Sequence, residues 1–278
     1  MKLAGRTAVV TGAGSGIGRA LAIALAKRGC NLALADVDEA GLAHTRGLIE
    51  GHAVESHAAR SRAVNIRLHA LDVADQVAVA DFPAAVTKHH SKVDLLINNA
   101  GVALGGSFEE ISEADFQWLF NINFWGVVWM TRAFLPVLKQ SDAACIVNMS
   151  SLFGLIAPPG QTAYSASKFA VRGFSNALRY ELSGSTVALT VVHPGGVATS
   201  IAKNSRKPRD RSPAQIAAAV ARIEKMLRMP PERAAEIIVA GVEKGKARIL
   251  VGADAKAASA LERLMPESYW TILSRALK

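Results

Sequence analysis

The sequence predicts an α/β fold, a doubly wound parallel sheet of seven strands in a single domain that spans residues 1–278. Short β-branched runs alternate with helix-like stretches, which is typical of βαβ units and a parallel sheet. The runs are nearly continuous in apolar residues, as expected when helices cover both faces of a sheet. The expected strands are residues 7–11, 31–35, 66–71, 93–98, 145–150, 186–192 and 248–251.

Composition is that of an enzyme-sized globular domain. Half of the residues are apolar and 20% are charged, so the chain can bury a full core. The first residues lack a signal-peptide pattern, and no stretch of about 18 apolar residues occurs. We therefore expect a cytoplasmic protein with no membrane contact. Cys30 and Cys145 are far apart and outside any CxxC pair, so we expect them to be buried thiols.

A net charge of +9 could attract an acidic partner. The basic residues are dispersed apart from residues 203–211, and no aromatic platform accompanies them, so we do not expect nucleic-acid binding. Nor do we expect a metal, because the seven histidines show no ligand spacing such as HExxH. His193 precedes Pro194 and is either near the active site or a plain strand-end residue, the interpretation that we favour.

Two segments depart from the strand and helix alternation. Residues 200–230 begin with a basic, proline-containing stretch and continue as a helical segment, which indicates an insertion over a site. Its basic residues could contact an anionic substrate or form a solvated loop; they are Lys203, Arg206, Lys207, Arg209 and Arg211. Residues 253–278 follow the last strand and could form one or two amphipathic helices that pack within the domain or against another subunit.

A glycine-rich turn, TGAGSGIG, occupies residues 11–18 between a strand and a helical run. Gly12, Gly16 and Gly18 follow a GxxxGxG pattern, in place of GxGxxG. Glycine permits positive φ and lets a pyrophosphate approach the helix N-terminus. A tight structural loop is the alternative.

Asp36 ends the second expected strand, 18 residues after Gly18. A carboxylate there can accept hydrogen bonds from both hydroxyls of an adenine ribose. The same charge repels a 2′-phosphate, and residues 31–43 contain no Arg or Lys that would compensate. The sequence thus favours NAD over NADP. A helix cap or turn residue is the alternative interpretation of Asp36.

Several motifs occur together in order, and over residues 5–252 the chain resembles the short-chain dehydrogenase/reductase family, which has a Rossmann fold. They are TGxxxGxG at 11–18, Asp72 with Val73, NNAG at 98–101, Asn123 in NINFWG, Ser151 in NMSSLFG, Tyr164 and Lys168 in YxxxK, and PGGVAT at 194–199. The resemblance implies that Tyr164 is the acid/base, supported by Ser151, Lys168 and Asn123.

Spacing supports the YxxxK pair independently. Tyr164 and Lys168 are four residues apart in a helical stretch, so they share one face. A neighbouring ammonium and a cationic nicotinamide would both favour the phenolate, so we expect a lowered pKa for Tyr164.

Two positions require a choice between neighbours. Ser151 lies 13 residues before Tyr164, a spacing that matches the family better than that of Ser150, and it would orient the substrate oxygen. The surrounding SSLFG is not the GxSxG of hydrolases. In a long helix over about 112–139, the family pattern selects Asn123 over Asn121, with the implied role of kinking the helix and holding a proton-relaying water.

The resemblance also implies the cofactor contacts. Asp72 would accept from the adenine amino group, Asn99 to Gly101 would line the adenosine side, and residues 194–199 would shape the nicotinamide pocket. The full set is Gly12, Ser15, Gly16, Ile17, Gly18, Asp36, Asp72, Val73, Asn99, Ala100, Gly101, Tyr164, Lys168, Pro194, Gly195, Val197 and Thr199.

These inferences predict hydride transfer between NAD(H) and a secondary alcohol or ketone. Apolar loops at 102–108 and 152–161 favour a lipophilic or medium-sized substrate; they contain Leu104, Phe108, Leu152, Phe153, Leu155 and Ile156. The alternatives are an NADPH-linked β-ketoacyl-type reductase and a non-catalytic, dinucleotide-binding regulatory protein. Family members usually form homodimers or homotetramers, which we expect here.

Overall fold

The central sheet has all seven of the predicted strands. A computed structural model describes residues 1–55, 64–208 and 211–276. The strands run parallel in the order β3-β2-β1-β4-β5-β6-β7. The predicted doubly wound, single-domain α/β fold is therefore confirmed. The strands are β1 (Thr7–Thr11), β2 (Asn31–Asp36), β3 (Ile66–Ala70), β4 (Leu95–Asn98), β5 (Ala144–Met149), β6 (Val187–Pro194) and β7 (Arg248–Val251).

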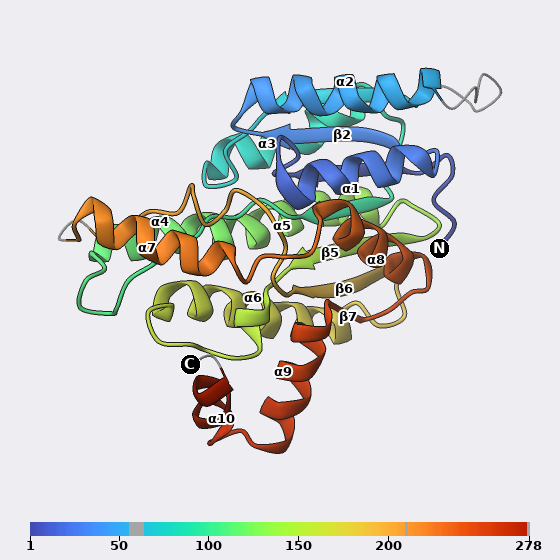
Figure 1. The fold of residues 1–278 in the computed structure, drawn as a ribbon. Helices are drawn as coiled ribbons and strands as arrows, with labels where there is room; N and C mark the ends of the chain where they lie inside the picture. The colour runs from blue at the N-terminus through green and yellow to red at the C-terminus, as the bar shows by residue number, and fades with distance from the viewer. Residues whose placement is uncertain (56–63, 209–210, 277–278) are drawn as a thin grey trace.

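Helices cover both faces of this sheet (Figure 1). Successive strand residues point to opposite faces, so Val10 and Ile97 enter one core while Val9 and Leu96 enter the other. The first core is closed by α1 (Gly16–Lys27), α2 (Glu39–Glu55) and α8 (Pro231–Glu243). The second is closed by α3 (Gln76–Thr87), α5 (Gly126–Leu138) and α6 (Thr162–Glu181). Burial of both strand faces explains why the runs are continuously apolar.

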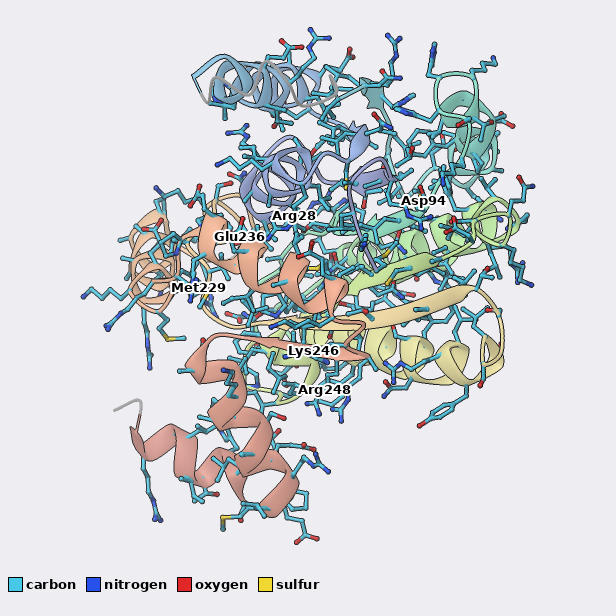
Figure 2. All side chains as sticks on the ribbon, turned by 90° about the vertical axis from the view of Figure 1, so that its right-hand side faces the viewer. Arg28, Asp94, Met229, Glu236, Lys246 and Arg248 are labelled. Atoms are coloured by element: carbon cyan, nitrogen blue, oxygen red, sulfur yellow. The ribbon has the colours of Figure 1, made fainter. Side chains whose placement is uncertain are left out.

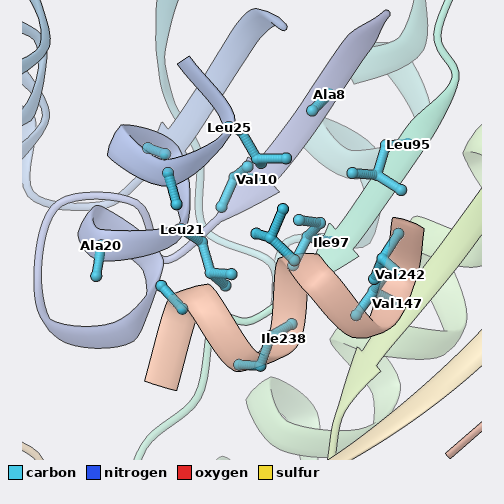
Figure 3. Close-up of a cluster of buried hydrophobic side chains, with 14 of the residues drawn as sticks. Ala8, Val10, Ala20, Leu21, Leu25, Leu95, Ile97, Val147, Ile238 and Val242 are labelled. Atoms are coloured by element: carbon cyan, nitrogen blue, oxygen red, sulfur yellow. The ribbon is translucent and has the colours of Figure 1, made fainter. Parts of the chain in front are cut away.

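Helices α1 and α8 are far apart in the chain but pack side by side on the first face. Figure 3 shows Leu21 and Leu25 of α1 and Ile238 and Val242 of α8 in one apolar cluster over the central strands. At the rim, Arg28 forms ion pairs with Glu236 at 2.8 Å and with Glu243 at 3.2 Å. Arg28 and Glu236 lie close together in Figure 2. Apolar burial and charge pairing thus join α1, early in the chain, to α8, which precedes the last strand.

The long helix expected over about 112–139 is present but irregular. It runs through α4 (Glu113–Phe120), a π-helical turn η1 (Asn121–Trp125) and α5. Ser112 begins it by accepting a hydrogen bond from the Asp115 N–H at 3.1 Å. A π-turn places one extra residue in the helix, and such turns are frequent at functional sites. Asn123 lies in the middle of this turn.

The two departures from strand and helix alternation also form helices. The 200–230 segment contains α7 (Pro213–Glu224), which Ser212 and Gln215 start with a capping box. The C-terminal extension forms α9 (Ala253–Leu264) and α10 (Tyr269–Ala276), which lie beyond β7 (Figure 1). A short 3₁₀ turn, η2 (Leu152–Gly154), follows β5. Among the described helices, none is long and apolar enough to cross a membrane.

Candidate active site

The predicted site residues gather at the carboxyl ends of the parallel strands. The glycine-rich turn follows β1, Asn99 follows β4, Ser151 follows β5 and Pro194 ends β6. The chain crosses between the two halves of the sheet where β1 pairs with β4. Ligands of doubly wound sheets bind at such a switch point.

Tyr164 and Lys168 lie one turn apart on α6, as their spacing predicts. The Lys168 Nζ is 5.8 Å from the centroid of the Tyr164 ring and donates a hydrogen bond to the Met149 carbonyl at 3.1 Å. Lys168 is only 4% exposed, and this burial lowers the pKa of its ammonium to about 8. The amine is therefore held rigidly and is easier to deprotonate than a surface lysine.

Tyr164 departs from the expectation for its pKa. Burial raises the pKa of the hydroxyl, and a hydrogen bond with Ser151 offsets only part of that effect. The prediction of a lowered pKa is wrong for the chain by itself, because the cost of burying a phenolate outweighs the residues around it. The tyrosine hydroxyl is thus protonated at neutral pH in the protein alone.

The structure separates the two neighbouring serines. Ser150 is buried and donates its hydroxyl to the Lys168 carbonyl at 2.9 Å. The Ser151 hydroxyl instead accepts from the Phe153 N–H at 3.1 Å and lies close enough to Tyr164 to lower the pKa of its hydroxyl. The ring of Phe153 meets the Tyr164 ring edge-on at 6.2 Å. Ser151, and not Ser150, therefore lies beside the tyrosine hydroxyl.

The two asparagines are separated in the same way. Asn123 is fully buried and pairs with both backbone groups of Val102, at 2.8 Å and 3.0 Å. It also donates to the Ser167 hydroxyl at 3.3 Å. Asn121 accepts from Gln117 at an exposed position. Asn123 thus joins α6 to the loop after β4, within the arrangement that contains Lys168.

The glycine-rich turn fits a dinucleotide. Gly12 and Gly16 have φ of +66° and +51°, which favour glycine. A Cβ on Gly18 would lie 1.9 Å from the Gly12 carbonyl oxygen, so the turn packs too tightly for any other residue. Ser15 is exposed at the start of α1, where backbone N–H groups and the helix dipole favour a phosphate.

Asp36 contacts this turn directly. Its carboxylate accepts hydrogen bonds from the Gly14 N–H at 2.8 Å and from the Asp38 N–H at 3.1 Å. A Cβ on Gly14 would come 2.9 Å from the carboxylate. Asp36 is therefore held at the edge of the turn, where a ribose next to the bound phosphates would lie.

This combination of fold and motifs has clear relatives. The family profile described as short chain dehydrogenase matches residues 6–210. The chain belongs to the short-chain dehydrogenase/reductase family. It is 43% identical over 272 residues to a Mycobacterium tuberculosis protein, SadH, whose name assigns it provisionally to the oxidoreductases; the match covers 97% of this chain and 94% of the relative.

Solved structures agree with this membership. A short-chain dehydrogenase/reductase from Burkholderia phymatum in complex with NAD superposes with a TM-score of 0.85, at 30% identity and 96% coverage of each chain. An alcohol dehydrogenase from Thermococcus sibiricus complexed with 5-hydroxy-NADP gives a TM-score of 0.72 at 25% identity, covering 88% of this chain and 95% of that one. The chain is therefore an enzyme of this oxidoreductase family with a dinucleotide cofactor.

Other predicted cofactor residues of this short-chain dehydrogenase/reductase mostly shape the backbone. Asn99 donates its amide to the Thr11 carbonyl at 2.9 Å, and the Thr11 hydroxyl accepts from the N–H groups of Asn99 and Ala100, both at 3.0 Å. Thr11 is thus a residue of the site that sequence reasoning did not single out, although it opens the TGxxxGxG motif. The remaining positions pack locally: Ile17 against the first core, Asp72 on the Ala74 N–H, Val73 against Gly126, and Gly101 between Asn123 and Lys168.

The loop over residues 194–199 is braced from the C-terminal extension. The Gly196 N–H donates to the Asp254 carboxylate at 2.6 Å. A Cβ on Gly195 would lie 2.2 Å from that carboxylate, so the glycine makes room for it. Val197 is buried, and Thr199 lies against Gly16. Asp254 was not predicted, because no motif marks a contact between residues 58 positions apart.

The basic segment of this enzyme pairs with acidic residues of its own chain. Arg206 forms an ion pair with Asp115 at 2.7 Å and lies 3.7 Å above the Trp118 ring. Arg211 pairs with Glu110 at 2.8 Å. These pairs argue against both arginines as free contacts for an anionic substrate. Lys203 pairs with Glu224, Lys207 donates to two backbone carbonyls, and Arg209 lies outside the described residues.

The apolar loops are more buried than the sequence suggests. Leu104, Leu155 and Ile156 are all buried, and Leu104 packs in a cluster that includes Tyr164. Phe108 is 69% exposed. Leu104 and Phe153 therefore contribute to the apolar surroundings of Tyr164, while Leu155 and Ile156 are buried.

Proposed function

We propose that this enzyme oxidises a secondary alcohol, or reduces the corresponding ketone, with NAD(H) as cofactor. The observation that carries the proposal is the placement of the Ser151 hydroxyl where it lowers the pKa of Tyr164, with the Lys168 ammonium 5.8 Å from the tyrosine ring. Such a cluster can bind a single carbonyl or hydroxyl oxygen from two sides.

The chain's residues suit a proton exchange at that oxygen. Tyr164 gives its proton to the oxygen during reduction and takes it during oxidation, while Ser151 donates a hydrogen bond that stabilises the developing charge. The Lys168 ammonium, 5.8 Å from the tyrosine ring, favours the phenolate through its positive charge when the proton leaves Tyr164. Asn123 holds the loop after β4 beside Lys168. A bound nicotinamide supplies or accepts the hydride.

Asp36 supports NAD over NADP. Its carboxylate lies at the glycine-rich turn, where it can accept from ribose hydroxyls and would repel a 2′-phosphate. The Burkholderia relative is described with NAD and the Thermococcus one with 5-hydroxy-NADP, so the family uses both. An NADPH-linked reductase is therefore the alternative that this carboxylate disfavours.

The apolar side chains beside Tyr164 support a lipophilic substrate. A separate pocket of about 310 Å³ borders the 200–230 segment and is lined mostly by polar residues: Ala198, Thr199, Ser200, Lys203, Glu224 and Leu227. Beside Tyr164, Leu104 and Phe153 provide apolar contact. We infer a lipophilic or medium-sized alcohol or ketone.

We also propose a homodimer or homotetramer formed through α4, α5 and α6. Aromatic side chains gather on these helices and on η1, which joins α4 to α5, and Trp125 and Phe169 are 41% and 37% exposed. Light scattering should then report a multiple of the 29.3 kDa chain. The expectation of a cytoplasmic protein stays a prediction.

The decisive experiment is a panel of secondary alcohols and ketones assayed by NADH absorbance with wild type, Tyr164→Phe and Ser185→Ala. Ser185 lies in the turn before β6, away from the site, and is the matched control. Turnover that Tyr164→Phe abolishes and Ser185→Ala keeps supports the proposal. Tight NADH binding without turnover of any substrate would favour the non-catalytic, regulatory alternative.

A further inference from the structure

His193 is a fully buried residue near the end of β6. His193 is four residues after Leu189 in the same strand, so both side chains point to the same face of the sheet, the one that α6 covers. The ring Nδ1 is 3.0 Å from the Ser151 carbonyl oxygen. Because a carbonyl only accepts, Nδ1 carries the proton and donates this bond.

Backbone pairing between β5 and β6 stops just before Ser151. The Ser150 N–H donates to the Val192 carbonyl at 2.9 Å. The next donor along β6 would be the N–H of residue 194, but this residue is a proline and has none. The His193 side chain thus supplies the next link between the strands, one residue beyond the end of the ladder.

Of three other contacts of Ser151, two are local and the third comes from α6. Its carbonyl also accepts from the Gly154 N–H at 3.0 Å, and its hydroxyl contacts Phe153 and Tyr164. Gly154 and Phe153 belong to the same short turn, which would move together with Ser151. Of these contacts, the His193 bond is the one that comes from the sheet.

We propose that His193 is a positioning residue for Ser151, whose backbone it ties to β6 so that the serine hydroxyl stays beside Tyr164. The proposal rests on the proposed oxidoreductase function. Burial lowers the pKa of His193 to about 4, with Arg248 and Arg172 contributing, so the ring is neutral at physiological pH. Within the described residues its Nε2 is buried without a hydrogen-bond partner, which leaves Nδ1 as the ring's donor.

A matched pair of variants tests this role. His193→Asn keeps a donor on the atom that replaces Nδ1, whereas His193→Leu places a methyl group there, and both remove a similar part of the ring. We expect His193→Leu to lower kcat by about 10- to 100-fold and His193→Asn by less than about 3-fold, because small misplacements of reacting groups cost this much. KM and NADH affinity should change little in either variant. Equal kcat values for the two variants would overturn the proposal.

A double-mutant cycle separates positioning from general damage. If His193 acts through Ser151, His193→Leu in a Ser151→Ala background should lower kcat by less than about 2-fold. The same loss in both backgrounds would contradict the proposal, whatever its effect on melting temperature.

A measurement that needs no turnover tests the positioning role separately from the proposed reaction. Backbone amide NMR signals of residues 150–154 should shift in His193→Leu and stay near their wild-type positions in His193→Asn. If wild type turned over no alcohol or ketone, the reaction proposal would fail while this comparison still stood. Unshifted signals in His193→Leu would refute the positioning role.

Discussion

Thr199 lies directly against Gly16, so that a Cβ added to the glycine would come 3.1 Å from the threonine Cγ2. Gly16 is the first residue of α1, where the glycine-rich turn ends, and Thr199 lies in the loop after β6. The two segments that would hold the phosphates and the nicotinamide are therefore in contact. A change in the backbone of either one should be felt at both ends of the cofactor.

The tightest point of the turn gives the first prediction. Gly18→Ala should weaken NADH binding by more than about 10-fold and lower stability by about 2 kcal/mol or more, because its Cβ would overlap the Gly12 carbonyl. Gly47→Ala, on α2 with nothing within 4 Å of the new Cβ, should instead be stabilising by about 0.5–1 kcal/mol. NADH fluorescence titration and thermal unfolding measure both effects. Similar behaviour of the two variants would refute the packing argument.

Cofactor choice should depend on the charge of Asp36. Asp36→Asn keeps an acceptor for the Gly14 N–H but removes the carboxylate. We expect it to weaken NADH binding by about 10-fold, the loss of a charge-assisted hydrogen bond, and to strengthen NADPH binding. Asp38→Asn removes the same charge two residues away and should leave the NADH to NADPH ratio of Kd values nearly unchanged. If both variants changed the NADH to NADPH ratio of Kd values equally, cofactor preference would depend on the net charge of this region and not on recognition of the ribose by Asp36.

Lys168 should make stability depend on pH. Its folded-state pKa is about 8 against an unfolded value near 10.5, so the unfolded chain binds more protons between these values. Stability conferred by this site therefore rises as pH increases from 7 to 10. Relative to Lys168→Met, the wild-type free energy of unfolding should gain about 2 kcal/mol over this range. Urea denaturation without cofactor at pH 7, 8, 9 and 10 tests it, and a constant difference between the two proteins would exclude the shift.

The ion pair of Arg206 should hold the 200–230 segment in place. Arg206→Gln removes the pair with Asp115 and the contact with Trp118, and the pair is partly exposed, so the stability cost should stay below about 1 kcal/mol. We expect a higher KM for substrate with a smaller effect on kcat, together with faster proteolysis of this segment. Arg222→Gln, at an exposed position on α7, is the control. An unchanged KM and cleavage rate in Arg206→Gln would show that the pair does not hold the segment.

Local pattern made some parts of this molecule predictable. Apolar runs located every strand, and they are most complete in central strands such as β1 and β4, which are buried on both sheet faces. The edge strand β3 is partly exposed and contains Arg67 and His69. Helical spacing brought Tyr164 and Lys168 to one face of α6, and the family pattern chose Ser151 and Asn123, the members of each pair that lie beside Tyr164 and Val102.

Contacts between distant segments were not predictable in the same way. Asp254 reaches Gly196, Arg206 reaches Asp115 and His193 reaches Ser151 only after the sheet has assembled. From the sequence, His193 was either near the nicotinamide or a plain strand-end residue, and neither interpretation includes its hydrogen bond to the Ser151 carbonyl. The pKa of Tyr164 was predicted in the wrong direction for the protein alone because burial could not be judged from spacing.

The packing of α1 against α8 has a consequence for synthesis of the protein. Leu21 and Leu25 are made early, while Ile238 and Val242, which cover them, come more than 200 residues later. At about 5–20 residues per second, a ribosome needs at least about ten seconds to deliver the covering helix. During that interval the nascent chain exposes an apolar face of an incomplete sheet. Chaperone demand and loss to aggregation should therefore concentrate in the last stage of translation, before α8 leaves the exit tunnel.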